Sequence, residues 1–173
     1  MSAPVPAAPA PSPAEIRSLL MRANRLLGAS LVEANLVTIE QLESANEKLL
    51  DLIAAGSPRQ CTLLGVLAYD LKVISEDDVL QHCVEEHGLG LIDLDAYDGA
   101  EEVRAKLDHS VCWATWTLPF DRDEEFTLVA SAYYLSPAVR TFWEKQFGGQ
   151  VIWYGATLEV IADTLERLAA AKP

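Results

Sequence analysis

Basic residues are scarce in this sequence, and long apolar runs are absent. The chain has 13 lysines and arginines and 26 aspartates and glutamates, so its formal charge at neutral pH is −13. A charge of this sign repels nucleic-acid backbones and anionic lipid headgroups, so we expect no nucleic-acid partner, whereas basic protein partners are compatible with it. No stretch approaches the roughly 20 apolar residues that a membrane-spanning helix requires, so we expect a protein that does not span a membrane.

Cysteine is scarce as well. Cys61, Cys83 and Cys112 form a sparse set of odd number, which suits free thiols in a reducing compartment better than a disulfide framework. The N-terminus has neither the basic region nor the hydrophobic region of a secretory signal. We therefore expect a cytoplasmic protein. Its 173 residues, 50% of them hydrophobic, have room for one ordinary domain or for two small ones that share a core.

Patterns that would indicate catalysis are missing or weak. No GxxxxGK[ST] phosphate loop occurs, so ATP hydrolysis is excluded. The acidic pairs Glu85–Glu86 and Asp121–Asp123 fit solvated surface better than a catalytic acid and base, because no apolar pocket is evident around them. We expect a protein that is not an enzyme and needs no cofactor.

A zinc site can be assembled on paper but has a simpler explanation. Cys83, His87, His109 and Cys112 together supply a Cys2His2 ligand set. Cys83, however, takes the place of a framework leucine in a repeated helical unit, where a free cysteine behaves as a small buried hydrophobe. We therefore expect no metal.

The chain begins with a proline-rich tail. Residues 1–13 read MSAPVPAAPAPSP, and repeated prolines favour an extended, solvated segment. Ser12 has the position of a helix N-cap, with Pro13 at the first helical position and Glu15 in place to complete a capping box. Apolar residues at helical spacing then predict a helix whose buried face contains Ile16, Leu19, Leu20, Ala23, Leu26 and Leu27.

Residues 14–87 contain a tandem repeat. The segment 26–49, LLGASLVEANLVTIEQLESANEKL, aligns with 63–86, LLGVLAYDLKVISEDDVLQHCVEE; Gly28 matches Gly65 and Thr38 matches Ser75, since 65 − 28 and 75 − 38 both equal 37. We interpret each Leu-Leu-Gly as a tight turn, and each unit restarts a helix at its Thr or Ser cap. The two units are predicted to pack on each other, joined by a loop over 54–61.

Residues 88–171 mix helix and strand patterns. Strands are predicted at 89–95, 113–120, 126–132 and 150–154, with a polar hairpin turn at 121–124. Helices are predicted over 100–107, from Ser136 to Phe147, and after the capping residue Thr157. The whole chain is therefore predicted to have an α+β fold, in which tandem helix-turn-helix repeats pack with a mixed subdomain that contains a small sheet.

From Leu26 to Leu168 the chain resembles the N-terminal domain of the type II secretion and type IV pilus assembly ATPases. That family's helical unit runs RLGxxLVxxGLIxxxxLxxxLxxQ, often in tandem, followed by a strand like Gly90–Asp95, then Leu118–Pro119 and a strand like Thr127–Ala130. In the version called MshEN, the tandem units are a receptor for cyclic di-GMP. The resemblance implies a module of bacterial secretion or pilus machinery and suggests cyclic di-GMP as a ligand.

The family's ligand-binding positions carry other residues in both repeats. The motif's arginine falls on Leu26 and Leu63, its second glycine on Asn35 and Lys72, and its glutamine on Leu49 and Glu86. An arginine would stack on a base or pair with a phosphate, and the leucines at its two positions, Leu26 and Leu63, can do neither. We interpret the repeats as inherited architecture without the side chains that recognise the ligand.

If a nucleotide does bind, the resemblance places it on the two Leu-Leu-Gly segments. The candidate contacts are Arg25, Leu27, Gly28, Leu31, Val32, Leu64, Gly65 and Arg59. Arg25 lies one residue before the expected arginine, a slip that turns a helical side chain by about 100°. Arg22 or Arg59 could reach a phosphate instead.

Aromatic residues crowd the second half of the chain. Trp113 and Trp116 should point to opposite faces if one regular strand carries both. Most of the aromatic side chains are expected in the core, because a small mixed domain needs large residues to fill it. Tyr133, Tyr134 and Trp143 are our candidates for a partner surface, since aromatic residues dominate binding hot spots.

Three functions are compatible with these patterns. The favoured one is a non-enzymatic adaptor or regulatory module with a protein partner, for which the resemblance suggests a secretion or pilus component. The second is a receptor for cyclic di-GMP or another nucleotide. The third is a scaffold that oligomerises through its repeats.

Overall fold

A computed structural model describes residues 10–55, 62–95 and 101–170. The helices are α1 (Pro13–Glu33), α2 (Ile39–Ala55), α3 (Leu63–Gly65) with its π-helical continuation η2 (Val66–Asp70), α4 (Glu76–His87), α5 (Glu101–Ala105), α6 (His109–Thr115), α7 (Pro137–Gln146) and α8 (Leu158–Ala170). The strands are β1 (Gly90–Leu91), β2 (Thr117–Asp123), β3 (Phe126–Ser131) and β4 (Val151–Gly155). Within the described residues, no helix combines the length and apolar character needed to cross a membrane.

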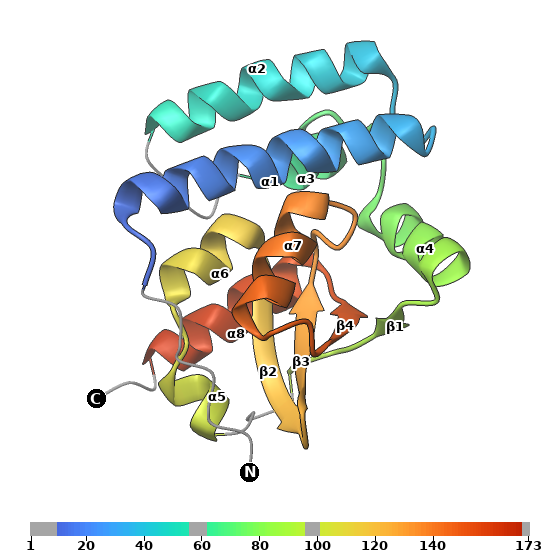
Figure 1. The fold of residues 1–173 in the computed structure, drawn as a ribbon. Helices are drawn as coiled ribbons and strands as arrows, with labels where there is room; N and C mark the ends of the chain where they lie inside the picture. Colours follow the sequence, from blue (N-terminus) through green and yellow to red (C-terminus); the bar gives the residue numbers. More distant parts are fainter. Residues whose placement is uncertain (1–9, 56–61, 96–100, 171–173) are drawn as a thin grey trace.

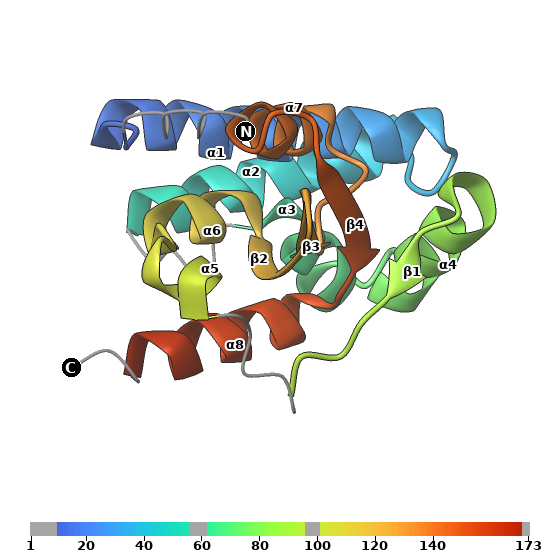
Figure 2. The same ribbon diagram turned by 60° about the horizontal axis from the view of Figure 1, so that its bottom comes forward.

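The strands form one mixed sheet in the order β1-β4-β3-β2. β2 and β3 are an antiparallel hairpin, whereas β4 runs parallel to both β3 and β1. The parallel pair β3–β4 is joined through α7, and Figure 2 shows α7 and α8 on opposite sides of the sheet. Helices therefore cover both faces of the sheet, and the predicted α+β fold class is confirmed.

The helical layer is built around α1. Ser12 and Glu15 form the predicted capping box, with the Glu15 amide donating to Ser12 Oγ at 3.2 Å and the Ser12 amide donating to Glu15 Oε2 at 3.1 Å. α1 then packs across α6 and α7, while α2 lies along it as an outer layer (Figure 1). One buried cluster accordingly contains residues from both halves of the chain.

The predicted repeat is present as two equivalent helix–turn–helix units. The first helices end at Glu33 and Asp70, and the second helices begin at Ile39 and Glu76, so both pairs differ by 37 residues. Thr38 forms its predicted capping box with Gln41, through hydrogen bonds of 2.9 and 3.1 Å. In the second unit the Ser75 hydroxyl accepts the Asp78 amide at 3.1 Å.

The tight turn of each unit does not lie at Leu-Leu-Gly, and that prediction is wrong. Gly28 lies inside α1 and Gly65 inside α3. At Gly28 a Cβ atom would lie 2.6 Å from Leu42 Cδ1, so the missing side chain lets α2 approach α1 closely. The chain turns instead at Asn35 (φ 60°) and Lys72 (φ 53°), the positions where the family motif has its second glycine.

The two units pack differently from each other. α1 and α2 contact each other and α3, and α2 also contacts η2. α4, by contrast, packs mainly against β1, on the side of the sheet edge (Figure 1). The expectation that the two helix pairs stack on each other therefore holds for α1, α2 and the continuous segment α3–η2. It does not hold for α4.

Three predictions about the second half are also wrong, at least in part. The start of the strand predicted at 113–120 is helical, because residues up to Thr115 belong to α6, and β2 begins at Thr117. The Asp108 side chain caps α6 by accepting the amides of Ser110 and Val111. Trp116 ends the helix in a left-handed conformation (φ 48°), so Trp113 and Trp116 do not share a strand. β2 also runs through most of the predicted 121–124 turn, and the strand predicted at 89–95 is only Gly90–Leu91.

A buried polar network centred on Tyr133 joins the two halves. The Tyr133 hydroxyl donates to Asn24 Oδ1 of α1 at 2.7 Å and lies 2.6 Å from the Thr62 hydroxyl, just before α3. Asn24 Oδ1 also accepts the Leu63 amide at 2.9 Å, and Thr62 Oγ1 accepts the Gly65 amide at 3.3 Å. Every polar side-chain group in the network has a partner, which a buried network requires to be stabilising.

A second connection joins the repeats to α8. The Glu76 carboxylate is buried; it accepts the Leu158 amide at the start of α8 at 2.7 Å and also accepts the Tyr69 hydroxyl. A carboxylate at a helix N-terminus meets unpaired amides and the positive end of the helix dipole. Glu76 thus fixes the second unit against the C-terminal helix.

Removing the Tyr133 hydroxyl should destabilise the protein. In a Tyr133→Phe variant, Thr62 and Asn24 each lose a buried hydrogen-bond partner, so we expect the free energy of unfolding to fall by about 1–3 kcal/mol. Urea denaturation measures this loss. Tyr134→Phe is the matched control, because the Tyr134 hydroxyl makes no hydrogen bond to the described residues, and equal losses in both variants would contradict the role of the network.

The Tyr69–Glu76 contact predicts a pH dependence. The hydrogen bond to the Glu76 carboxylate, followed by burial, raises the pKa of Tyr69 from 10.0 to about 12. A raised folded-state pKa means that the protonated phenol stabilises the fold below pH 10.0, and that this contribution disappears as the pH rises towards 12. We expect the difference in the free energy of unfolding between wild type and Tyr69→Phe to shrink as the pH rises through this range. A constant difference would refute the contact.

Candidate binding groove

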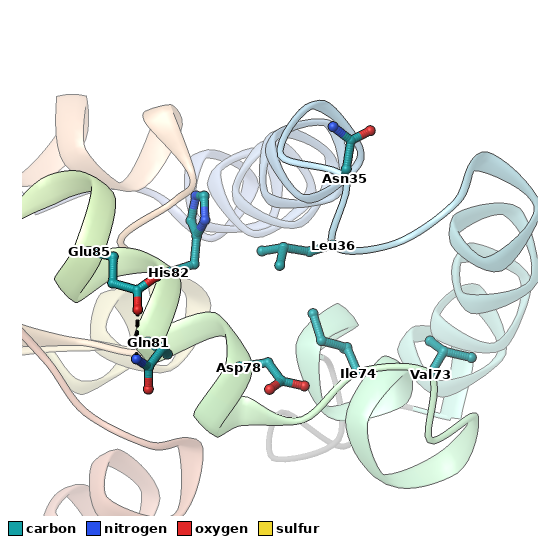
Figure 3. Close-up of a pocket in the computed structure, with 8 residues that line it drawn as sticks. All are labelled: Asn35, Leu36, Val73, Ile74, Asp78, Gln81, His82 and Glu85. Carbon is teal, nitrogen blue, oxygen red and sulfur yellow. Dashed lines mark hydrogen bonds between the residues drawn. The ribbon is translucent and has the colours of Figure 1, made fainter.

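A groove lies between the turns of the two repeat units and α4. We name it the inter-turn groove. Its volume is about 310 Å³, and its lining residues, drawn in Figure 3, are Asn35, Leu36, Val73, Ile74, Asp78, Gln81, His82 and Glu85.

The repeat itself builds the floor of the inter-turn groove. Leu36 and Val73 occupy equivalent positions, one residue after the left-handed residues Asn35 and Lys72. Each turn therefore contributes an apolar residue at this position to the lining, and the second turn adds Ile74, which Figure 3 shows facing Leu36 across the hollow. The duplication thus produces a two-sided apolar floor.

One face of α4 builds the rim. Its four lining residues, Asp78, Gln81, His82 and Glu85, follow the spacing of three and four residues that places side chains on one side of a helix. Gln81 Nε2 donates to Glu85 Oε1 at 2.8 Å, which holds that carboxylate at the rim. The rim is exposed and polar, while the floor is largely apolar.

The charge of the groove is negative. Asp78 and Glu85 line it, and none of its lining residues is a lysine or an arginine. In a chain of net charge −13, this arrangement repels phosphate groups and attracts cationic or hydrogen-bond-donating groups. The groove therefore suits a ligand that has a basic side chain next to an apolar side chain.

Two of the four positions that correspond to the family's arginine and glutamine face the core. Leu63 is fully buried and Leu49 is 5% exposed, so both pack inside the helical layer. Leu26 is half-buried, whereas Glu86 is exposed but carries the wrong charge for a phosphate. At the positions where the motif has an arginine or a glutamine, this chain therefore has side chains that pack in or near the core or are exposed to solvent.

The candidate nucleotide contacts include buried, half-buried and exposed residues. Leu27, Gly28, Leu31 and Leu64 are buried, Val32 and Gly65 are half-buried, and Arg25 is exposed on α1, as is Arg22. Arg59 and most of the predicted loop 54–61 lie outside the described residues. None of the described candidates lines the inter-turn groove.

Comparisons with known proteins identify the fold. No protein-family model matches the sequence, and no curated protein matches it. A solved structure of MshE with cyclic di-GMP, however, matches 82% of this chain and 97% of its own chain, with a TM-score of 0.51 and 20% sequence identity. The chain has the MshE fold.

This match confirms, at the level of the fold, the resemblance detected in the tandem helical motif. The match covers 82% of this chain, more than either half contains, so it includes parts of both the repeats and the mixed subdomain. At this identity the likeness concerns architecture alone. What the MshE-like fold binds here must follow from its own side chains.

The proposed zinc ligands are not brought together. Cys83 on α4 and Cys112 on α6 are buried free thiols, and burial raises the pKa of Cys83 to about 11 and that of Cys112 further. Within the described residues, no group of three or more His, Cys, Asp or Glu side chains could hold a metal ion. Core packing is the role that the two cysteines have in this structure.

The predicted aromatic partner surface is largely wrong. Tyr133 is fully buried and Trp143 is 4% exposed, with its indole Nε1 donating to Thr115 Oγ1 at 3.1 Å. Only Tyr134, which is half-buried beneath Arg140, reaches the surface. The rim of the inter-turn groove was not predicted from the sequence, although the spacing of its four polar residues indicated that they share one face of a helix.

Glycine substitutions test the left-handed turns that form the groove floor. A lysine at φ 53° costs about 1–2 kcal/mol relative to glycine, offset by the greater chain entropy of glycine when unfolded. We expect Lys72→Gly to raise the free energy of unfolding by about 0.5–1 kcal/mol, and Asn35→Gly to raise it less, because asparagine tolerates this conformation. Chemical denaturation measures both.

Lys48→Gly is the control for these variants, because Lys48 is an exposed residue inside α2. There a glycine should lower stability by about 0.5–1 kcal/mol. A loss of similar size at Lys72 would show that the second turn is not left-handed.

Proposed function

We propose that this chain is a non-enzymatic adaptor or regulatory module that binds a polypeptide partner in the inter-turn groove. The observation that carries the proposal is the lining of that groove, where Asp78 and Glu85 border a largely apolar floor and none of the described lining residues is a lysine or an arginine. A partner segment with a basic residue beside an apolar residue matches both features. The absence of a phosphate loop from the sequence supports a non-enzymatic role.

A cyclic di-GMP receptor is the competing proposal, because the matched MshE structure contains that ligand. Two phosphates need compensating cations or clusters of free amides. At the motif's arginine positions this chain has Leu26 and the buried Leu63. The basic residues of α1 are Arg17, Arg22 and Arg25; all three are exposed and none of them lines the groove. These facts favour the adaptor.

The partner class follows from the resemblance to the secretion and pilus ATPase domains. A component of such machinery with a basic, partly apolar segment is the partner that we propose. Binding through surface charges should weaken as salt is added, because exposed charges are screened.

A capture experiment tests this proposal. The immobilised full chain is incubated with extract of its native cells, and bound proteins are quantified across a salt series for wild type, Glu85→Lys and Glu86→Lys. Glu86 lies next to Glu85 on α4 and has the same charge, but it does not line the groove. We expect Glu85→Lys to weaken capture of the specific partner about tenfold, a change of about 1.4 kcal/mol, and Glu86→Lys to leave it nearly unchanged.

Calorimetry with cyclic di-GMP is run on the same preparations. The adaptor proposal expects no binding in the micromolar range. It fails if wild type binds cyclic di-GMP with micromolar affinity and that binding is lost on substitution of Gly28 or Gly65, or if Glu85→Lys and Glu86→Lys affect partner capture equally.

A further inference from the structure

Arg140 is a cation without a carboxylate partner among the residues that the structure describes. Its Nε atom is buried and has no hydrogen-bond acceptor. Glu144, four residues further along α7, is on the same side of the helix and close enough to pair with this arginine. Glu144 Oε1 instead accepts the indole Nε1–H of Trp153 at 3.3 Å. In a chain with 26 acidic and 13 basic residues, an arginine left unpaired requires an explanation.

One aromatic ring contacts this arginine, and two further rings contact that ring. Its guanidinium carbon lies 5.1 Å from the centre of the Tyr134 ring, a cation–π contact. The Tyr134 ring is in turn 5.5 Å from the His87 ring and 5.8 Å from the Trp153 ring, both in edge-to-face geometry. His87 is exposed, and Tyr134 and Trp153 are half-buried. We name these four residues the Arg140 patch.

The patch is assembled from four parts of the fold. His87 ends α4, Tyr134 follows β3, Arg140 lies in α7 and Trp153 lies in β4. Arginine, tyrosine and tryptophan are the residue types that dominate binding hot spots. Stacking on Tyr134 also reduces the entropy that the arginine loses when it binds a ligand, because the guanidinium is already restrained.

We propose that the Arg140 patch binds the carboxylate of an acidic side chain in a partner polypeptide, with an aromatic residue of that partner lying on the neighbouring rings. The planar guanidinium can form two parallel hydrogen bonds to a carboxylate. A single cation in a chain of net charge −13 matches a singly charged group better than a phosphate. The exposed parts of the His87 and Trp153 rings supply apolar contact for the aromatic residue.

This inference does not depend on the function proposed for the inter-turn groove. The groove is acidic and is tested through Glu85, whereas the patch is cationic and is tested through Arg140. Failure of either test leaves the other standing.

An NMR titration tests the patch. The full-length ¹⁵N-labelled chain is titrated with the blocked dipeptide N-acetyl-Phe-Asp-amide and with N-acetyl-Phe-Asn-amide, which has the same shape without the charge. The indole N–H signal of Trp153, assigned with Trp153→Phe, reports binding. We expect saturable shifts with the aspartate peptide and at least about tenfold weaker binding of the asparagine peptide. A separate titration with inorganic phosphate shows whether the patch binds that anion.

Variants at Arg140 complete the test. Arg140→Gln should abolish the shift, and Arg140→Lys, which keeps the charge but loses the planar fork, should weaken binding several-fold. Arg22→Gln, at an exposed arginine of α1, is the matched control and should bind normally. The proposal is overturned if both peptides bind equally, if binding survives both Arg140 variants, if phosphate binds as tightly as the aspartate peptide, or if no probe shifts the Trp153 signal.

Discussion

The hydroxyl group of Tyr133 is the contact on which the arrangement of this fold depends. It joins Asn24 of α1 to Thr62, the residue that begins α3, and so fixes the start of the second repeat unit against the first. A buried hydroxyl or amide without a partner is costly, so these residues must meet in the folded chain. Because α3 continues through η2 into the second turn, the same network sets where that turn lies relative to the first. The inter-turn groove is a consequence of this placement.

The MshE-like fold and its binding chemistry are separable in this chain. The apolar framework, the caps and the left-handed turns of the repeat are kept, although asparagine and lysine occupy the turns in place of glycine. Leucines at the positions of the motif's arginine and glutamine add to the core or to its edge. The adaptor function that we propose therefore uses other surfaces of the fold. The acidic groove and the cationic Arg140 patch adjoin through α4, where the ring of His82, which lines the groove, lies 5.9 Å from that of His87.

Local signals in the sequence predicted local structure well. The caps at Ser12, Thr38 and Ser75 depend on neighbours three residues away, and all three are present. Features that depend on distant partners were not predictable. Gly28 reads as a turn residue but is required because Leu42 approaches it, and Tyr133 reads as a surface aromatic but finds its partner, Asn24, 109 residues away. The groove was missed for the same reason, because it forms only when two turns and a helix meet.

Hydrogen–deuterium exchange provides the most direct test of the central claim that this fold retains the repeat but binds a polypeptide rather than a nucleotide. Exchange is measured for the chain alone, with cyclic di-GMP, and with its captured protein partner. The account predicts that the partner protects amides of the two turns and of α4, and that cyclic di-GMP leaves exchange unchanged. Protection of the two Leu-Leu-Gly segments by cyclic di-GMP, with no partner-induced protection at the turns, would contradict it.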